Sequence, residues 1–298
     1  MQDQSISNEQ LPIARSGVSP SLFIKLFTRA QERLRHPRQR IRLARFVAAT
    51  RPRTDKDRTH ADRELAMDGV TFMPNYLTVE RAAELRALLA IFDCQDPWKP
   101  EHGRFPLKDA PAGTHVADIP AAPTLKALHD IAFDERLVRL AARYFGCRPY
   151  VDSVQAWWSL PGNKEPEEAE NFHRDNDSIR FLKFFLYLTD VGDADGPHKF
   201  VKGSHLDPRA LDRRRHTDSE VANIFGDDRI LTMRGAAGDA FMEDTFGMHK
   251  GQLPENGLRL LVQVRYSIMP SVFRSPMVVE GSPPVMKEKA DSLLHSRG

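Results

Sequence analysis

Asn171-Phe172-His173-Arg174-Asp175 is the stretch of this 298-residue chain around which the rest is organised. His173 and Asp175 are two residues apart, so on an extended strand both side chains leave the same face. An imidazole and a carboxylate that converge in this way can fill two positions on one metal ion. A histidine from another strand would complete the two-histidine, one-carboxylate set typical of non-haem iron sites.

Short strands dominate the sequence around this pair. Phe181 to Leu188 is an apolar run interrupted only by Lys183, as expected of a buried strand. Further strand candidates, separated by turns and loops, are 69–74, 150–158, 198–201, 229–233, 239–245, 248–250 and 258–268. Helices are expected from Thr78, a plausible N-cap, and over 125–145, ending near Gly146. Long loops are expected at 93–123 and 206–228. This order predicts a mostly β protein with flanking helices, an antiparallel jelly roll or barrel rather than an α/β sheet.

Five histidines follow Asp175 as candidates for the missing ligand: His198, His205, His216, His249 and His295. His216 and His295 lie in polar segments typical of solvated loops. His198 follows a Gly-Pro turn at the start of a strand, where a surface position is expected. His205 and His249 remain, and His249 has the better context because it follows the strand at 239–243 and a tight turn.

Arg259 lies ten residues after His249, in the otherwise apolar strand predicted at 258–268. A guanidinium does not give up its charge, so an arginine in a strand built for the core needs an anionic partner. A bound dicarboxylate, held by two parallel hydrogen bonds, would be one such partner. A structural Asp or Glu at the barrel edge would be another, and the residues alone leave this choice open.

The ordered series of motifs resembles the phytanoyl-CoA dioxygenase family over roughly residues 62–270. The matching segments are Asp68-Gly69-Val70, His173-Arg174-Asp175, Leu188-Thr189-Asp190, Asp195-Gly196-Pro197, Val201-Lys202-Gly203-Ser204-His205, His249 and Arg259. Lys202 stands where relatives usually have proline. The resemblance implies a double-stranded β-helix, or jelly roll, that holds Fe(II) and uses 2-oxoglutarate and O2, with ascorbate as a candidate further cofactor.

The same resemblance assigns roles to individual residues. It implies that His173, Asp175 and His249 are the iron ligands and that Arg259, rather than its rival Arg265, binds the far carboxylate of 2-oxoglutarate. Two more positions, Gln155 and Tyr187, match residues that contact 2-oxoglutarate in relatives, although each is also explained as a strand residue facing the core. Relatives that halogenate replace the triad carboxylate by a small residue, so Asp175 favours hydroxylation, with release of succinate and CO2.

Two other classes of function stay open. A non-redox, cupin-like metalloprotein such as a hydrolase or isomerase would use the same His/Asp/His set but would not need Arg259. A non-catalytic module that binds a membrane surface would need no metal. The substrate is not readable, although the charge of the chain favours an anionic or lipid-linked molecule, such as a lipopolysaccharide sugar.

The charge is unevenly distributed. Residues 1–60 hold 13 Lys and Arg against 5 Asp and Glu, whereas the remainder holds 30 against 36. A basic arm on a mildly acidic body indicates an anionic partner, and nucleic acid is disfavoured because the arm lacks an aromatic-interleaved basic groove. The amphipathic segments 22–34 and 38–47 either pack on the main domain or lie on anionic lipid.

Composition and the order of segments limit the class of protein and its domain organisation. The 41% apolar content suffices for a core, and two cysteines, Cys94 and Cys147, are too few for a disulfide framework. We find no signal peptide and no run of about 18 apolar residues, so a cytoplasmic protein, peripheral on the inner membrane face at most, is expected. We expect a basic arm at 1–61 that ends in a linker over 50–62, a dioxygenase domain at 62–273 and a tail at 274–298.

Overall fold

The computed structural model describes residues 33–51, 58–162 and 165–269, and within them two antiparallel sheets face each other. The major sheet consists, in order, of β1 (Val70–Met73), β9 (Ala240–Glu243), β6 (Phe181–Tyr187), β11 (Arg259–Ser267), β5 (Tyr150–Ser159), β4 (Val116–Asp118), β2 (Cys94–Gln95) and β3 (Arg104–Phe105). The minor sheet consists of β10 (His249–Lys250), β7 (His198–Val201) and β8 (Ile230–Met233). This arrangement confirms the predicted jelly roll.

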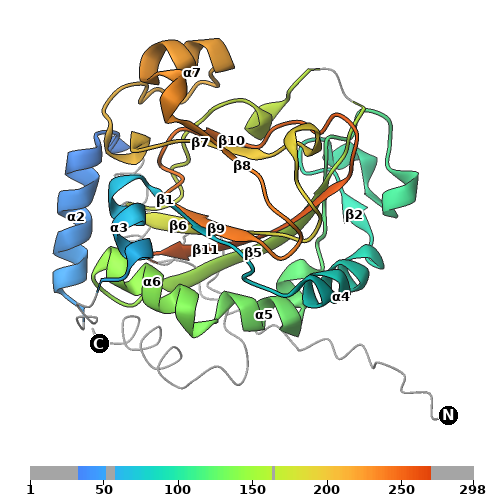
Figure 1. Cartoon of the computed structure of the whole chain (residues 1–298), viewed down its shortest axis with the longest axis horizontal. Coiled ribbons are helices and arrows are strands. Elements are labelled where there is room, and N and C mark those ends of the chain that lie inside the picture. Colours follow the sequence, from blue (N-terminus) through green and yellow to red (C-terminus); the bar gives the residue numbers. More distant parts are fainter. Residues whose placement is uncertain (1–32, 52–57, 163–164, 270–298) are drawn as a thin grey trace.

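Helices cover the outside of the major sheet, and one more lies on the side of the minor sheet. They are α2 (Pro37–Ala49), α3 (His60–Met67), α4 (Val79–Ala90), α5 (Lys126–Ala132), α6 (Glu135–Phe145) and, on the minor-sheet side, α7 (Asp218–Phe225). Figure 1 shows α4, α5 and α6 along one side of the major sheet and the minor sheet on its other side. The site therefore has to be sought between the sheets, where strands from both contribute side chains.

The central strand β11 shows how the sequence separates these two environments. Leu260, Val262 and Val264 are buried in the main core with the helices. The alternate residues face the minor sheet because successive side chains of a strand point to opposite faces, and Leu261 accordingly belongs to a second core formed with β6, β7 and β9. Arg259 and Arg265 share this inner face, so two cations lie inside the barrel.

Local signals account for the ends of several elements. The Thr78 hydroxyl accepts a hydrogen bond from the backbone N–H of Arg81, which caps α4 as predicted. Gly146 ends α6 with φ of 78°, a left-handed conformation that glycine adopts without steric cost. The helix expected over 125–145 is in fact two helices, because the Asp134 side chain caps a new one by accepting from Arg136 N–H.

The two segments predicted to be long loops contain regular structure. The short strands β2, β3 and β4 lie within 93–123 and extend the edge of the major sheet. Within 206–228, α7 begins at a capping box in which Thr217 and Glu220 bond each other's backbone. His173 is not in a strand but in an isolated bridge, so the strand expected for it is reduced to one pair.

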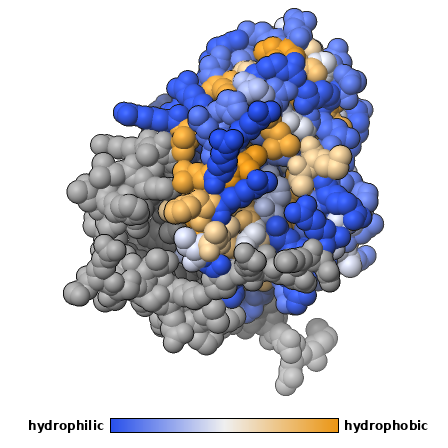
Figure 2. All heavy atoms as spheres, turned by 90° about the vertical axis from the view of Figure 1, so that its left-hand side faces the viewer, coloured by the Kyte–Doolittle hydropathy of each residue, from blue (hydrophilic) through white to orange (hydrophobic). Residues whose placement is uncertain are grey.

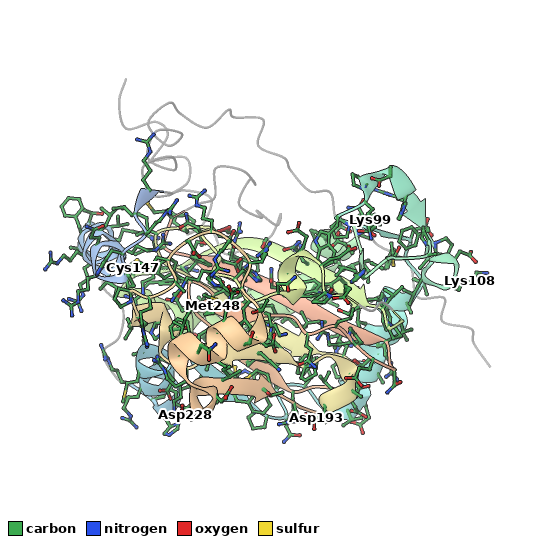
Figure 3. The ribbon with its side chains drawn as sticks, turned by 90° about the horizontal axis from the view of Figure 1, so that it is seen from above. Lys99, Lys108, Cys147, Asp193, Asp228 and Met248 are labelled. Carbon is green, nitrogen blue, oxygen red and sulfur yellow. The ribbon has the colours of Figure 1, made fainter. Side chains whose placement is uncertain are left out.

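The described part of the basic arm packs on the main domain. Ala44 and Ala48 of α2 are buried in the main core, and α3 spans the boundary expected near residue 61. Figures 1 and 3 place α2 at the opposite end of the molecule from the segment that carries Lys99 and Lys108. Most of the amphipathic segment at 22–34 and the tail at 274–298 lie outside the described residues. Among the described helices, none has the length and apolar character to cross a membrane.

Candidate metal centre

His173, Asp175 and His249 come together inside the barrel. One potential ligand atom from each residue lies within 4.8 Å of the others. Asp175 stands between the two histidines, with Oδ1 3.5 Å from Nε2 of His173 and Oδ2 3.4 Å from Nε2 of His249. Two imidazoles and one carboxylate on one side of a small space are a donor set suited to a divalent transition metal.

Backbone pairing brings together two histidines that are 76 positions apart in the sequence. The backbone N–H of each donates to the carbonyl of the other, at 2.9 and 3.0 Å, and their ring centroids are 4.3 Å apart. The Asp175 N–H donates to the Thr245 carbonyl at 2.9 Å. The segments 173–175 and 245–249 are therefore joined at two points. These hydrogen bonds fix the backbone positions of His173, Asp175 and His249.

The orientation of both rings is also fixed. Nδ1 of His173 lies 2.9 Å from the Asn171 carbonyl, and Nδ1 of His249 lies 2.9 Å from the Gly247 carbonyl. A carbonyl only accepts, so each Nδ1 carries the proton and each Nε2 presents its lone pair to the space beside Asp175. Protein metal sites typically orient histidine ligands in this way, and the donor set therefore fits a metal ion.

Lys183 forms an ion pair with the central carboxylate. Its Nζ lies 2.6 Å from Oδ2 of Asp175 and 3.1 Å from Asp177. Burial alone would raise the pKa of Asp175, but Lys183, and after it His249, holds that pKa well below its usual range. The carboxylate is therefore ionised and ready to bind a cation at neutral pH.

This ion pair is one end of a chain of charges along the inner face. Asp177 also pairs with Arg265 at 3.1 Å, and Arg265 pairs with Asp152 at 3.1 Å. Both carboxylates are thus partners of Arg265 within the protein. The guanidinium that had been the rival of Arg259 for a bound carboxylate is already engaged.

Arg259 is in the opposite situation. It is buried, its Nη2 donates to Ser159 Oγ at 2.8 Å, and its Nη1 reaches only the Gln252 carbonyl at 3.4 Å. Its Nε is buried without a hydrogen-bond partner, and no carboxylate of the described residues pairs with it. Burial lowers the pKa of Arg259, yet a guanidinium stays charged at neutral pH. The structure thus contains a buried cation without a carboxylate in direct contact, although the charge of Glu170 acts on it and partly offsets the lowering of its pKa.

Gln155 and Tyr187 both lie on the inner face but have partners in the protein. The Gln155 side chain accepts a hydrogen bond of 3.0 Å from Gln263 on the neighbouring strand. The Tyr187 hydroxyl donates to the Met233 carbonyl at 2.8 Å and accepts from the His198 N–H at 3.2 Å. Burial raises the pKa of Tyr187 to about 12, so this hydroxyl keeps its proton. Contacts of either residue with 2-oxoglutarate stay predictions.

Two expectations about histidines were wrong. His198 is not at the surface but 5% exposed, and its ring stacks on His249 with centroids 5.6 Å apart. His216 is not solvated but 2% exposed, since its backbone bridges Phe172 and its ring bonds Asp212. In both cases pairing between segments distant in sequence buries a residue whose local sequence is polar.

Sequence reasoning also missed Glu243 and the role of Lys183. They are directly opposite each other on β9 and β6, and both face inward. The Glu243 carboxylate is fully buried, and Oε1 lies 2.9 Å from Nε2 of His198. The signal was present in the sequence, because each is the single charged residue of its apolar strand.

A jelly roll with an inward-facing His/Asp/His set defines the class of double-stranded β-helix metalloproteins. Within that class, the chain belongs to the phytanoyl-CoA dioxygenase (PhyH) family, whose sequence pattern it matches over residues 66–252. This finding confirms the resemblance seen in the sequence. No curated protein sequence matches the chain.

Solved structures agree on the fold. The alpha-ketoglutarate-dependent carbocyclase SnoK from nogalamycin biosynthesis is 20% identical, with a TM-score of 0.53 over 78% of this chain and 97% of that one. EctD from S. alaskensis with bound Fe is 18% identical, with a TM-score of 0.51 over 78% and 94%. HygX from Streptomyces hygroscopicus, with nickel, 2-oxoglutarate and hygromycin B, is 16% identical, with a TM-score of 0.51 over 70% and 87%. At these identities the likeness is one of fold.

Proposed function

We propose that this protein is an Fe(II)- and 2-oxoglutarate-dependent oxygenase. Membership of the phytanoyl-CoA dioxygenase family and the structural likeness to enzymes that contain iron or nickel with 2-oxoglutarate support it. His173, Asp175 and His249 would hold the iron. When bound, the metal with 2-oxoglutarate and O2 supplies the oxidising chemistry, and succinate and CO2 are released.

The observation that carries the proposal is the unpaired, buried charge of Arg259. Burying a cation without a counter-ion is costly, and a dicarboxylate that accepted two hydrogen bonds from this guanidinium would offset that cost. Proximity to the metal centre supports this role, because Nη1 of Arg259 lies 3.4 Å from the carbonyl of Gln252, three residues after His249. A metal-chelating keto acid held at its far end by Arg259 is consistent with this arrangement.

Hydrogen bonds and charges around the three candidate ligands keep them in the state that binds a metal. The two Nδ1–carbonyl hydrogen bonds hold the imidazoles with Nε2 free, and Lys183 keeps Asp175 ionised. Because His173 and His249 are buried, little water reaches the ligand atoms, and charge interactions are stronger there than in solvent. The protein's task is thus to position reactants and exclude water.

The test is a titration of the purified protein with Fe(II) and 2-oxoglutarate under anaerobic conditions. The weak visible charge-transfer band of the iron chelate should appear in the wild type and be lost in His173→Ala. Absence of the band in folded wild-type protein would overturn the proposal. A non-redox, cupin-like protein would bind metal without this band, and a non-catalytic binding module would not need metal.

For the reaction we propose hydroxylation, because Asp175 fills the third ligand position and leaves no vacant place for a halide. The neighbours include an epimerase and a carbocyclase, so the assay should search for every oxidised product of a substrate and not only for alcohols. Succinate formation that depends on the substrate is the common readout for this group.

For the substrate we propose an anionic, lipid-linked molecule. The run at Arg213–Arg215 lends little support as a contact, because Arg214 pairs with Glu220 at 2.8 Å and Arg215 with Glu168 at 3.0 Å. Support comes instead from α2, whose outward face exposes Arg38, Arg42, Arg45 and Phe46. Figure 2 shows this end of the molecule, where apolar groups and charged side chains are interspersed. Basic and aromatic residues on one helix face suit the surface of an anionic membrane.

A further inference from the structure

The inner face of α2 ends in a buried arginine. Arg40, Ala44 and Ala48 follow each other at intervals of four and lie on one face of the helix. The two alanines enter the main core, whereas Arg40, only 3% exposed, reaches beyond it. An apolar residue at position 40 could have packed on the domain as Ala44 and Ala48 do. The presence of a buried arginine there therefore needs an explanation.

Arg40 contacts the first of the two segments that carry the metal ligands. Its Nη1 donates to Asn176 Oδ1 at 2.5 Å and its Nη2 to the Ser178 carbonyl. Asn176 directly follows Asp175, and the stretch from 174 to 180 has no regular secondary structure in which backbone bonds could hold it. Both hydrogen bonds come from a charged donor, which makes them stronger than those between neutral groups.

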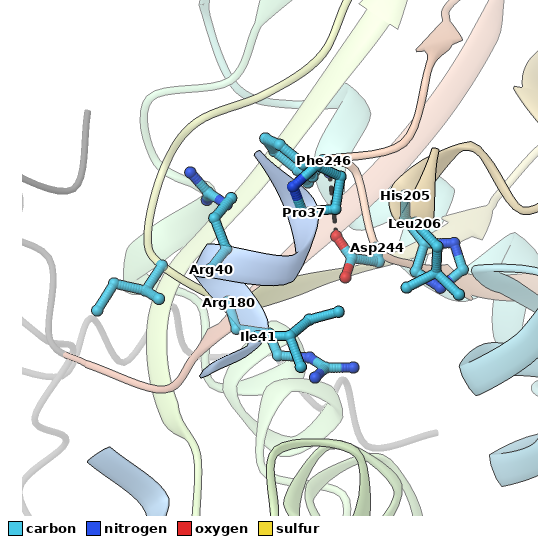
Figure 4. Close-up of a pocket in the computed structure, with 9 residues that line it drawn as sticks. Pro37, Arg40, Ile41, Arg180, His205, Leu206, Asp244 and Phe246 are labelled. Carbon is cyan, nitrogen blue, oxygen red and sulfur yellow. Dashed lines mark hydrogen bonds between the residues drawn. The ribbon is translucent and has the colours of Figure 1, made fainter. Parts of the chain in front are cut away.

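The same guanidinium contacts the second ligand segment. Its central carbon lies 4.1 Å from the centre of the Phe246 ring, and Phe246 is three residues before His249. Figure 4 shows Arg40 and Pro37 of α2 next to Phe246, and Asp244 bonded to the Phe246 N–H. The cavity between these residues measures about 20 Å³, room for roughly one water molecule, so the contact is a packed interface.

On the inner side, the same two segments are joined by the His173–His249 and Asp175–Thr245 backbone bonds. On the outer side, Arg40, which is a residue of the basic arm, joins the two segments again. We propose that Arg40 is a positioning residue of the metal centre, which holds the Asp175 and His249 segments at the spacing that the metal requires. The inference rests on the proposed function in one respect, that the His/Asp/His set binds a metal.

The consequence is that the arm belongs to the active site. Residues that orient metal ligands from outside typically change metal affinity by about 10- to 100-fold when they are removed. A helix with only a stabilising role would instead change the unfolding temperature and leave the affinity of the folded protein unaltered. Metal affinity, measured far below the unfolding temperature, separates the two.

The experiment compares the full-length wild type with Arg40→Ala, Arg40→Lys and the control Arg45→Ala, which is on the exposed side of the same helix. Co(II) is titrated anaerobically without 2-oxoglutarate, and its visible spectrum reports both affinity and ligand geometry. Arg40→Ala should bind about 10- to 100-fold more weakly, with an altered spectrum. Arg40→Lys should recover part of the affinity, and Arg45→Ala should equal the wild type.

Wild-type affinity and spectrum in folded Arg40→Ala would overturn the inference. If Arg40→Ala does not fold, Asn176→Ala and Phe246→Leu remove two of the three contacts of Arg40 with the ligand segments from the other side, and wild-type Co(II) binding in both would overturn it equally. A wild type that binds no Co(II) or Fe(II) would instead contradict the proposed function itself, so the two failures are distinguishable.

Discussion

Lys183 and Asp175 form a buried ion pair, Nζ to Oδ2 at 2.6 Å, inside the proposed metal centre. A metal ion bound by Asp175 would thus share that carboxylate with a lysine. Lys183→Met leaves Asp175 and Asp177 with fewer positive partners, and breaking a buried pair costs roughly 3–5 kcal/mol. A divalent ion at Asp175 can replace part of the lost charge, so metal should stabilise the variant more than the wild type.

Thermal unfolding with and without Co(II) measures this coupling. We expect a lower unfolding temperature for metal-free Lys183→Met and a larger rise on adding Co(II) than in the wild type. Lys199→Met is the matched control, because Lys199 pairs with the half-exposed Asp218 at the surface, where pairs contribute little. Equal rises in the Lys183 variant and the wild type would show that Lys183 does not act on the metal site.

The two inward arginines of β11 should respond in opposite ways to the same substitution. Arg265→Met removes the ion-pair partner that Asp152 and Asp177 share. It should lower the free energy of unfolding by roughly 3–5 kcal/mol. Arg259→Met removes a buried charge that has no carboxylate in direct contact, so the metal-free, ligand-free protein should be as stable as the wild type or more stable. Urea unfolding of the two variants decides the point, and equal losses would mean that Arg259 has a structural anion.

Arg259 should also differ from Arg265 in its effect on the affinity for 2-oxoglutarate. Arg259→Met loses charge-assisted hydrogen bonds of about 1.5–3 kcal/mol each, so its dissociation constant for 2-oxoglutarate should rise at least about tenfold. Its affinity for Co(II) alone should not change, because Arg259 provides no metal ligand. Calorimetric titration gives both values, and unchanged 2-oxoglutarate affinity in Arg259→Met would remove the main support for the proposed function.

The sequence was sufficient to predict the framework and to single out three residues that the structure brings together, but not their surroundings. His173 and Asp175 were found from a spacing of two, and the cap at Thr78 and the stop at Gly146 from local rules. The capping box at Thr217 and Glu220 could have been found in the same way and would have replaced a predicted loop by α7.

The misplaced residues share a physical cause. His198 was expected at the surface because a Gly-Pro turn precedes it, but pairing of β7 with β8 and β10 buries it against His249. Lys183 and Arg265 both form ion pairs with Asp177. The local sequence of neither strand predicts these ion pairs. Burial and pairing inside a barrel depend on register between distant strands, which periodicity within one strand does not determine.

Glu243 should make stability depend on pH in a direction opposite to that of most carboxylates. Burial, the largest effect, raises its pKa to about 8 from an ordinary value of 4.5. Below pH 4.5 both folded and unfolded chains hold the proton. As pH rises toward 8 the unfolded chain ionises while the folded one does not, so this group's contribution to stability is lost over that window.

Glu243→Gln cannot ionise and should become progressively more stable than the wild type between pH 5 and pH 8. The difference should grow by at most about 1.4 kcal/mol per pH unit, the limit for one proton. Urea unfolding of the metal-free proteins at several pH values measures it, with the exposed Glu84→Gln as control. Stability curves for Glu243→Gln and wild type that run parallel from pH 5 to pH 8 would exclude a neutral Glu243.

The outward face of α2 should bind anionic membranes if the substrate is lipid-linked. Each basic residue near an anionic surface contributes about 1 kcal/mol, so reversing Arg38, Arg42 and Arg45 to Glu should abolish sedimentation with phosphatidylglycerol vesicles at low salt. Phosphatidylcholine vesicles should bind neither protein, and added salt should release the wild type because exposed charges are screened. These three arginines are exposed, whereas Arg40 on the opposite face is buried, so the triple variant should keep wild-type Co(II) affinity. Equal vesicle binding by the wild type and the triple variant, or none by the wild type, would leave α2 with the internal role of Arg40 alone.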